Sequence, residues 1–128
     1  MHVYINDDET AIEGTVSELR NLSKFMKRAR IGSSMHYDLS QTATAEPYDK
    51  LLEKLVLDCN GSKIKGVIEG GVLKLEFSEE YGEIMASYFE FDENFQAGHR
   101  CHFDQYSNEE FFDPSSIEMI VQVSYKNI

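Results

Sequence analysis

The sequence predicts a single α+β domain in which two helices cover one face of an antiparallel or mixed sheet. Two segments with helical periodicity are each flanked by segments whose apolar residues alternate as they do in strands. This order occurs twice, so we expect two similar β-α-β repeats in halves of about 1–46 and 47–128. A length of 128 residues is sufficient for one domain with its own hydrophobic core.

The first half has the clearest local signals. Residues 2–6 alternate as a strand, and after the turn "NDDE" residues 10–14 can pair back as a hairpin. The sequence Thr-Val-Ser-Glu at 15–18 is a capping box, in which a threonine hydroxyl and a glutamate carboxylate satisfy the first free amides of a helix. This helix should end before Gly32, and the stretch 33–39 should follow it as a strand.

The second half begins after a polar, proline-containing stretch at 39–50, which we interpret as a linker. Residues 55–59 then alternate as a strand, and Asn60-Gly61 predicts a tight hairpin to the next strand. Gly70-Gly71 predicts a second hairpin turn before a strand at 73–77. Together these signals predict a meander of neighbouring strands.

The remaining elements complete the second repeat. Ser78 should cap a second helix, whose apolar stripe continues to Phe89. The stretch 99–106 reads as a strand, the acidic stretch 107–116 as a loop, and 117–125 as a final alternating strand. Exposed edges at this C-terminal strand would allow a homodimer, so we expect a monomer or a homodimer.

Charge is distributed unevenly along the chain, whose net charge is −11. Twelve of the 23 acidic residues lie between Glu76 and Glu118, together with a single base, Arg100, and ten of the 15 aromatic residues. Nucleic acids and anionic membranes bind to basic surfaces, so this composition argues against both as partners. It favours a basic protein partner.

The sequence also indicates where the protein resides. No window approaches the roughly 20 apolar residues of a membrane span, and the beginning "MHVYINDDET" lacks the basic and apolar regions of a signal peptide. Cys59 and Cys101 are too few for a disulfide framework and are expected to be reduced core thiols. We therefore expect a cytoplasmic protein.

Two strands carry a similar motif, Met35-His36-Tyr37-Asp38 and Cys101-His102-Phe103-Asp104. If the repeats met across a pseudo-twofold axis, two imidazoles and two carboxylates could share one face and bind a metal such as zinc. However, alternation along a strand places Cys101 and His102 on opposite faces, and the spacing matches no specific ligand signature. No metal or cofactor is therefore expected, and a metal-binding protein or enzyme using His36, Asp38, His102 and Asp104 is kept as the second alternative.

Known catalytic motifs are missing from the sequence. It contains no Gly-x-Ser-x-Gly elbow, no phosphate-binding glycine-rich loop and no His-Glu-x-x-His helix. The expectation is therefore that the protein is not an enzyme.

The acidic, aromatic part of the chain is the best candidate for a binding surface. Aromatic side chains supply most interface hot spots, and surrounding carboxylates accelerate the encounter with a basic partner. The candidate partner-binding residues are Glu90, Asp92, Glu93, Phe95, Tyr106, Glu109, Glu110, Phe111, Phe112 and Asp113.

Three stretches, "IEGTVSELRNLSKFM", "MHYD" and "HRCHFDQYSNEEFFDPSSIEMIVQV", resemble small immunity proteins of bacterial polymorphic toxin systems, which include contact-dependent inhibition. The resemblance covers residues 10–38 and 99–123. It implies a cytoplasmic protein that binds and blocks a cognate toxin domain without catalysing a reaction. A basic toxin domain such as a nuclease would suit the acidic charge, and the first alternative is a generic protein-interaction or regulatory module.

Overall fold

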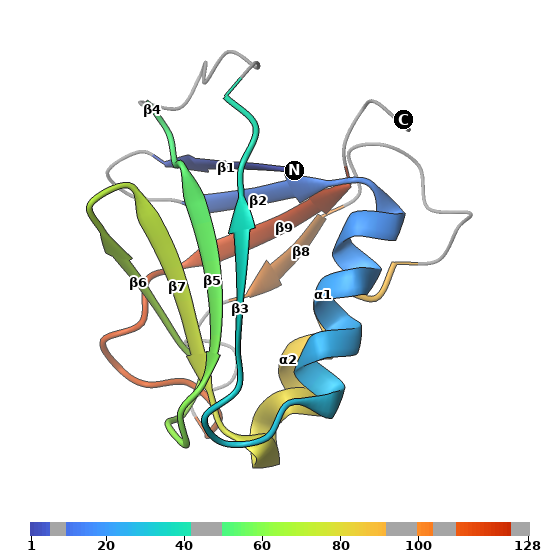
Figure 1. The fold of residues 1–128 in the computed structure, drawn as a ribbon, viewed down its shortest axis with the longest axis vertical. Helices are drawn as coiled ribbons and strands as arrows, with labels where there is room; N and C mark the ends of the chain where they lie inside the picture. Colours follow the sequence, from blue (N-terminus) through green and yellow to red (C-terminus); the bar gives the residue numbers. More distant parts are fainter. Residues whose placement is uncertain (6–9, 42–49, 92–99, 104–109, 124–128) are drawn as a thin grey trace.

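The computed structural model describes residues 1–5, 10–41, 50–91, 100–103 and 110–123, with only the backbone for Lys50 and for 100–103. These residues form an α+β fold with two sheets and two α-helices (Figure 1). The predicted fold class is confirmed, but the strands are divided between two sheets and do not form one. None of the described helices is long and apolar enough to cross a membrane.

Sheet A has five strands in the order β4-β1-β2-β9-β8. The neighbours β2 and β9 are parallel, and the other neighbouring strands are antiparallel. The strands are β1 (His2–Ile5), β2 (Thr10–Gly14), β4 (Lys50–Leu51), β8 (Arg100–Phe103) and β9 (Met119–Val123).

Sheet B has four strands in the order β3-β5-β7-β6, and again its central pair, β5 and β7, is parallel. Figure 1 shows the strands of sheet A lying across one end of the strands of sheet B. The strands are β3 (Ser34–Asp38), β5 (Lys54–Cys59), β6 (Lys65–Glu69) and β7 (Val72–Phe77).

Helix α1 (Val16–Arg28) begins at the predicted capping box. The Thr15 hydroxyl accepts from the Glu18 amide at 3.1 Å, and the Glu18 carboxylate accepts from the Thr15 amide at 3.0 Å. The second helix is shorter than predicted, a 3₁₀ turn η1 (Glu79–Tyr81) followed by α2 (Gly82–Ser87). Ser78 occupies the predicted N-cap position, but its side chain makes no capping hydrogen bond.

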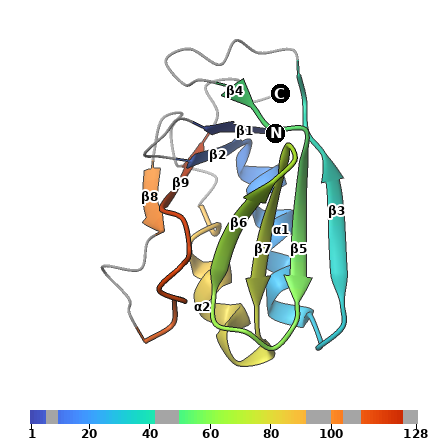
Figure 2. The same cartoon turned by 90° about the vertical axis from the view of Figure 1, so that its left-hand side faces the viewer.

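The core lies between the two helices, the inner face of sheet B and sheet A (Figure 2). Alternation along β5 and β7 turns one side chain in two toward the helices, as the sequence predicted. The helices approach closely at Gly82, where a Cβ atom would collide with the backbone carbonyl of Met26. Completely buried members of this core include Leu19, Leu22, Leu55, Leu57, Leu73, Leu75, Phe77 and Met85.

The predicted pair of β-α-β repeats, with halves 1–46 and 47–128, is not confirmed. Each helix connects a strand of one sheet to a strand of the other. Helix α1 lies between β2 of sheet A and β3 of sheet B, whereas α2 lies between β7 of sheet B and β8 of sheet A. A different regularity is present. In each sheet an antiparallel hairpin (β1-β2 or β6-β7) pairs in parallel with β9 or β5, which then pairs antiparallel with β8 or β3.

Two predicted turns have different outcomes. The Gly70-Gly71 hairpin is confirmed, with both glycines at positive φ and with Glu69 paired to Val72. The Asn60-Gly61 hairpin is wrong, because β7 lies between β5 and β6. Side-chain alternation identifies the buried face of a strand but not its neighbours, so the sequence pattern could not reveal this insertion.

Two further expectations are corrected. The final strand β9 lies between β2 and β8, so it is not an edge, and all five of its residues are buried. The stretch 39–50, interpreted as a linker, ends in β4, which pairs with β1 at the edge of sheet A.

Candidate functional site: an acidic surface beside the second helix

Aromatic contacts join the second helix to the acidic stretch before β9. The ring of Tyr81 meets the ring of Phe111 edge to face at a centroid distance of 5.8 Å, and Tyr88 meets Phe112 in the same way at 6.3 Å. Such edge-to-face pairs stabilise a contact beyond the area they bury. Two parts of the chain that the sequence analysis grouped by composition are therefore adjacent in the fold.

The segment 111–117, which we call the β6 cover, runs along the outer edge of β6. The Ile64 amide donates to the Phe111 carbonyl at 2.8 Å, and the Asp113 amide donates to the Ile64 carbonyl at 2.9 Å. Farther along, the Gly66 amide donates to the Ser116 hydroxyl at 2.9 Å, and the Ile117 amide donates to the Gly66 carbonyl at 3.1 Å. The cover therefore pairs backbone groups that an edge strand would otherwise leave open.

Burial separates the two phenylalanines of this cover. Phe112 is 1% exposed and belongs to the core, whereas Phe111 is half-buried. Because a partner cannot reach a side chain that is completely enclosed, Phe112 is a core residue in this structure and not an exposed anchor. The sequence showed two adjacent aromatics in an acidic loop and no sign of which one faces inward.

Three acidic residues are close in sequence to Tyr81 or Phe111. Glu80 and Glu83 lie at the start of the second helix, and Glu110 directly precedes Phe111; all three are exposed. No ion pair joins any of the three to a base in the part of the chain that the structure describes. We call these five residues the acidic surface.

Two other acids of the same region form ion pairs with bases of this chain. The carboxylate of Glu90 pairs with the Lys27 ammonium of α1. The carboxylate of Glu79 pairs with Arg30 at 3.2 Å. These two ion pairs link α1 and the residue Arg30 just after it to the second half of the chain, where most of the acidic residues lie.

Asp113 has a local role in the turn of the β6 cover. Its Oδ1 accepts hydrogen bonds from the Ser115 hydroxyl at 2.6 Å and from the Ser115 amide at 2.8 Å. These hydrogen bonds hold the pKa of the Asp113 carboxyl below its ordinary value, because they stabilise the charged form. The remaining predicted contact residues, Asp92, Glu93, Phe95, Tyr106 and Glu109, lie outside the described residues.

The backbone places the two histidine motifs in different sheets. His36 and Asp38 are exposed on β3 of sheet B, whereas His102 lies on β8 of sheet A, and Asp104 is outside the described ranges. Within the described ranges, no group of three or more His, Cys, Asp and Glu residues has the geometry of a metal site. The backbone thus places His36 and His102 in separate sheets, and the four-residue metal hypothesis stays a prediction.

The described cysteine, Cys59, is completely buried in the core. Burial raises the pKa of its thiol, and the neighbouring Glu79 and Asp58 carboxylates raise it further. A thiol with a raised pKa contains little thiolate at neutral pH, so it is a poor nucleophile. Its environment is that of a structural core residue.

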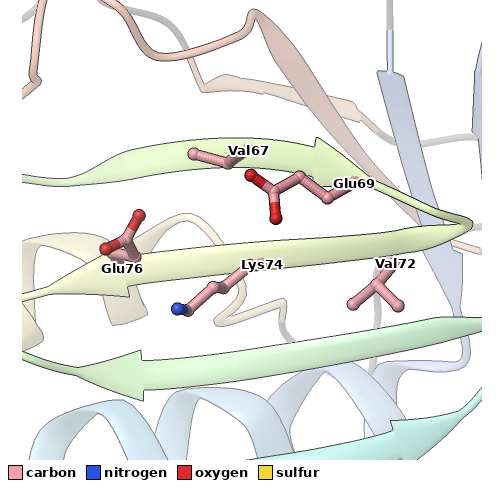
Figure 3. A pocket seen from close by; sticks show the side chains of 5 residues that line it. All are labelled: Val67, Glu69, Val72, Lys74 and Glu76. Carbon is pink, nitrogen blue, oxygen red and sulfur yellow. The ribbon is translucent and has the colours of Figure 1, made fainter.

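The outer face of sheet B is uncovered and forms a second, different surface (Figure 3). Val67 and Val72 line a shallow hollow of about 280 Å³ together with Glu69, Lys74 and Glu76. The Lys74 ammonium pairs at 3.4 Å with Asp58, and Lys54 and Lys65 occupy further outward positions of these strands, so acids and bases are mixed on this face. This face therefore lacks the unbalanced negative charge of the acidic surface.

Comparisons of the chain with protein-family models, with curated proteins and with solved structures return no match.

Proposed function

We propose that the protein is an immunity protein that binds and neutralises a basic bacterial toxin domain through its acidic surface. The observation that carries the proposal is a contact between two half-buried aromatic rings, Tyr81 and Phe111, whose neighbours in sequence include the exposed acids Glu80, Glu83 and Glu110. Carboxylates that form no ion pair with a described base can attract a cationic partner over a distance, and the rings give it apolar area to cover.

In this proposal Phe112 has a structural role, whereas Phe111 and Tyr81 contact the partner. The buried Phe112 holds the β6 cover in the core, and the half-buried Phe111 and Tyr81 stay accessible at its border. A nuclease domain is a suitable target, since its substrate-binding surface is basic and carboxylates can occupy the positions of phosphates. A generic interaction module whose partner is not a toxin is the alternative, and the identity of the bound partner decides between the two.

The test starts from the effector gene next to the gene for this protein. Co-expression should protect cells from the effector, and the purified toxin domain should bind the protein with an affinity that falls as salt rises. The double variant Glu80→Lys/Glu110→Lys should lower the association rate constant by about tenfold or more at low salt.

The matched control is Glu53→Lys/Glu69→Lys, which changes the net charge equally at two exposed positions, one just before β5 and one at the end of β6. It should retain most of the association rate and the full protection. Equal loss of binding in both double variants would assign the effect to net charge and reject the acidic surface. Absence of both binding and protection would reject the immunity function.

A further inference from the structure

The two edge strands of sheet B, β6 and β3, differ in what pairs with their outer sides. The edge at β6 is closed by the β6 cover, whereas β5 is the one described strand that pairs with β3 (Figure 2). Figure 2 shows β3 as the last strand on its side of the sheet. This open edge is independent of the acidic surface.

The hydrogen-bond register shows which backbone groups of β3 are free. The Leu39 amide donates to the Glu53 carbonyl at 2.8 Å, and the Cys59 amide donates to the Ser33 carbonyl at 2.9 Å. In an antiparallel pair, residues alternate between facing the partner strand and facing away. The N–H and C=O groups of Ser34, His36 and Asp38 therefore point away from β5, and no described residue bonds to them.

This edge lacks the usual protection against pairing. Edge strands commonly carry a lysine, a proline or a bulge, or are very short. β3 has five residues, none of them lysine or proline, and its register with β5 runs without interruption from Ser34 to Asp38. The nearby Ile31 is 67% exposed, a high value for a large apolar side chain.

We propose that β3 pairs antiparallel with β3 of a second copy of this chain, about a twofold axis at His36, and joins the two sheets into one of eight strands. In this register Ser34 lies opposite Asp38 of the second copy, so all the outward backbone groups pair. Met35 lies opposite Tyr37, and these half-buried side chains extend the inner apolar face across the axis.

Charge favours a second copy over a basic partner at this edge. Asp38 is the one carboxylate in the strand, and its partner in this register is a serine hydroxyl that can donate to it. No two like charges face each other across the axis while His36 is neutral. The edge has no excess of carboxylates to attract a basic protein.

The experiment measures self-association by light scattering and sedimentation over a concentration series. The unmodified protein should show twice the mass of one chain at the upper end of the series. His36→Pro should weaken association by at least about tenfold, because two symmetry-related hydrogen bonds are lost. Its fold should persist, since the missing N–H points away from β5.

A second variant avoids any change to the backbone. His36→Glu places two carboxylates opposite each other and should also weaken association, whereas the control His36→Val should retain it. Circular dichroism confirms that each variant is folded.

Register is tested in a Cys101→Ser background. His36→Cys should form a disulfide between two copies, because residues directly opposite lie within disulfide range, whereas Ser34→Cys, which faces Asp38, should not. A protein that stays monomeric throughout the series overturns the proposal. A dimer that both His36→Pro and His36→Glu leave intact overturns the assignment to β3.

Discussion

The outer edges of β6 and β3 belong to the same sheet but have different surroundings. β6 is bonded along its edge to the segment 111–117, whereas no segment among the described residues covers β3 in this way. The cover of β6 comes from the connection between β8 and β9, just as the connection between β3 and β5 supplies β4 to cover β1. The acidic stretch before β9 therefore has a structural role, the closing of the β6 edge, which its composition alone did not reveal.

The largest expected effect comes from removing the anchor of the β6 cover. Phe112→Ala should lower the free energy of unfolding by about 3–5 kcal/mol, because it leaves a cavity in the core. Phe111→Ala is the matched control and should cost clearly less, since that ring is half-buried. Urea denaturation of both variants measures the difference. Equal losses would show that Phe112 is no more of an anchor than Phe111.

The next effect concerns the hydrogen bond that closes the edge at Gly66. Ser116→Ala should lower the free energy of unfolding by about 1–3 kcal/mol, because it leaves the buried Gly66 amide without its acceptor. Amide hydrogen exchange should also accelerate at Gly66 more than at the central strand β7. Unchanged exchange at Gly66 would mean that Ser116 does not close this edge.

The smallest effect is a pH dependence at the turn of the cover. The pKa of Asp113 is lowered in the folded protein, so its charged form stabilises the fold above the ordinary carboxyl value. This contribution is lost as pH falls from that value through the lower folded pKa. Ser115→Ala should therefore be destabilising at neutral pH, and the difference from the unmodified protein should shrink in acid.

Ser87→Ala is the control for this titration, because the Ser87 hydroxyl donates to a backbone carbonyl and not to a carboxylate. Its stability difference should stay constant with pH. If the stability difference between Ser115→Ala and the unmodified protein also stays constant with pH, the hydrogen bonds to Asp113 do not depend on the charge of the Asp113 carboxyl.

The sequence predicted the local structure better than the pairing of distant strands. The capping box at Thr15 and the Gly70-Gly71 hairpin are determined by residues close in sequence, and both predictions are confirmed. The parallel pairs β2-β9 and β5-β7 are not encoded in any local pattern, because alternation specifies a buried face and leaves the neighbour open.

The candidate site shows the same limit. Composition correctly brought the second helix and the stretch around Glu110 into one region. It did not distinguish Phe111 from Phe112, because the inward turn of Phe112 depends on the pairing of its backbone with Ile64. The internal pairs of Glu79 and Glu90 likewise depend on where α1 lies.

The pairing of β2 with β9 has a consequence for how the protein is made. Glu13 lies beside Gln122, 109 residues later, and their side chains share a hydrogen bond of 2.7 Å. Contacts between such distant residues slow folding, because a long loop must close before any pairing energy is gained. Sheet A can be completed only after residues 119–123 have left the ribosome, so its parallel pair forms after both helices and all of sheet B have been synthesised.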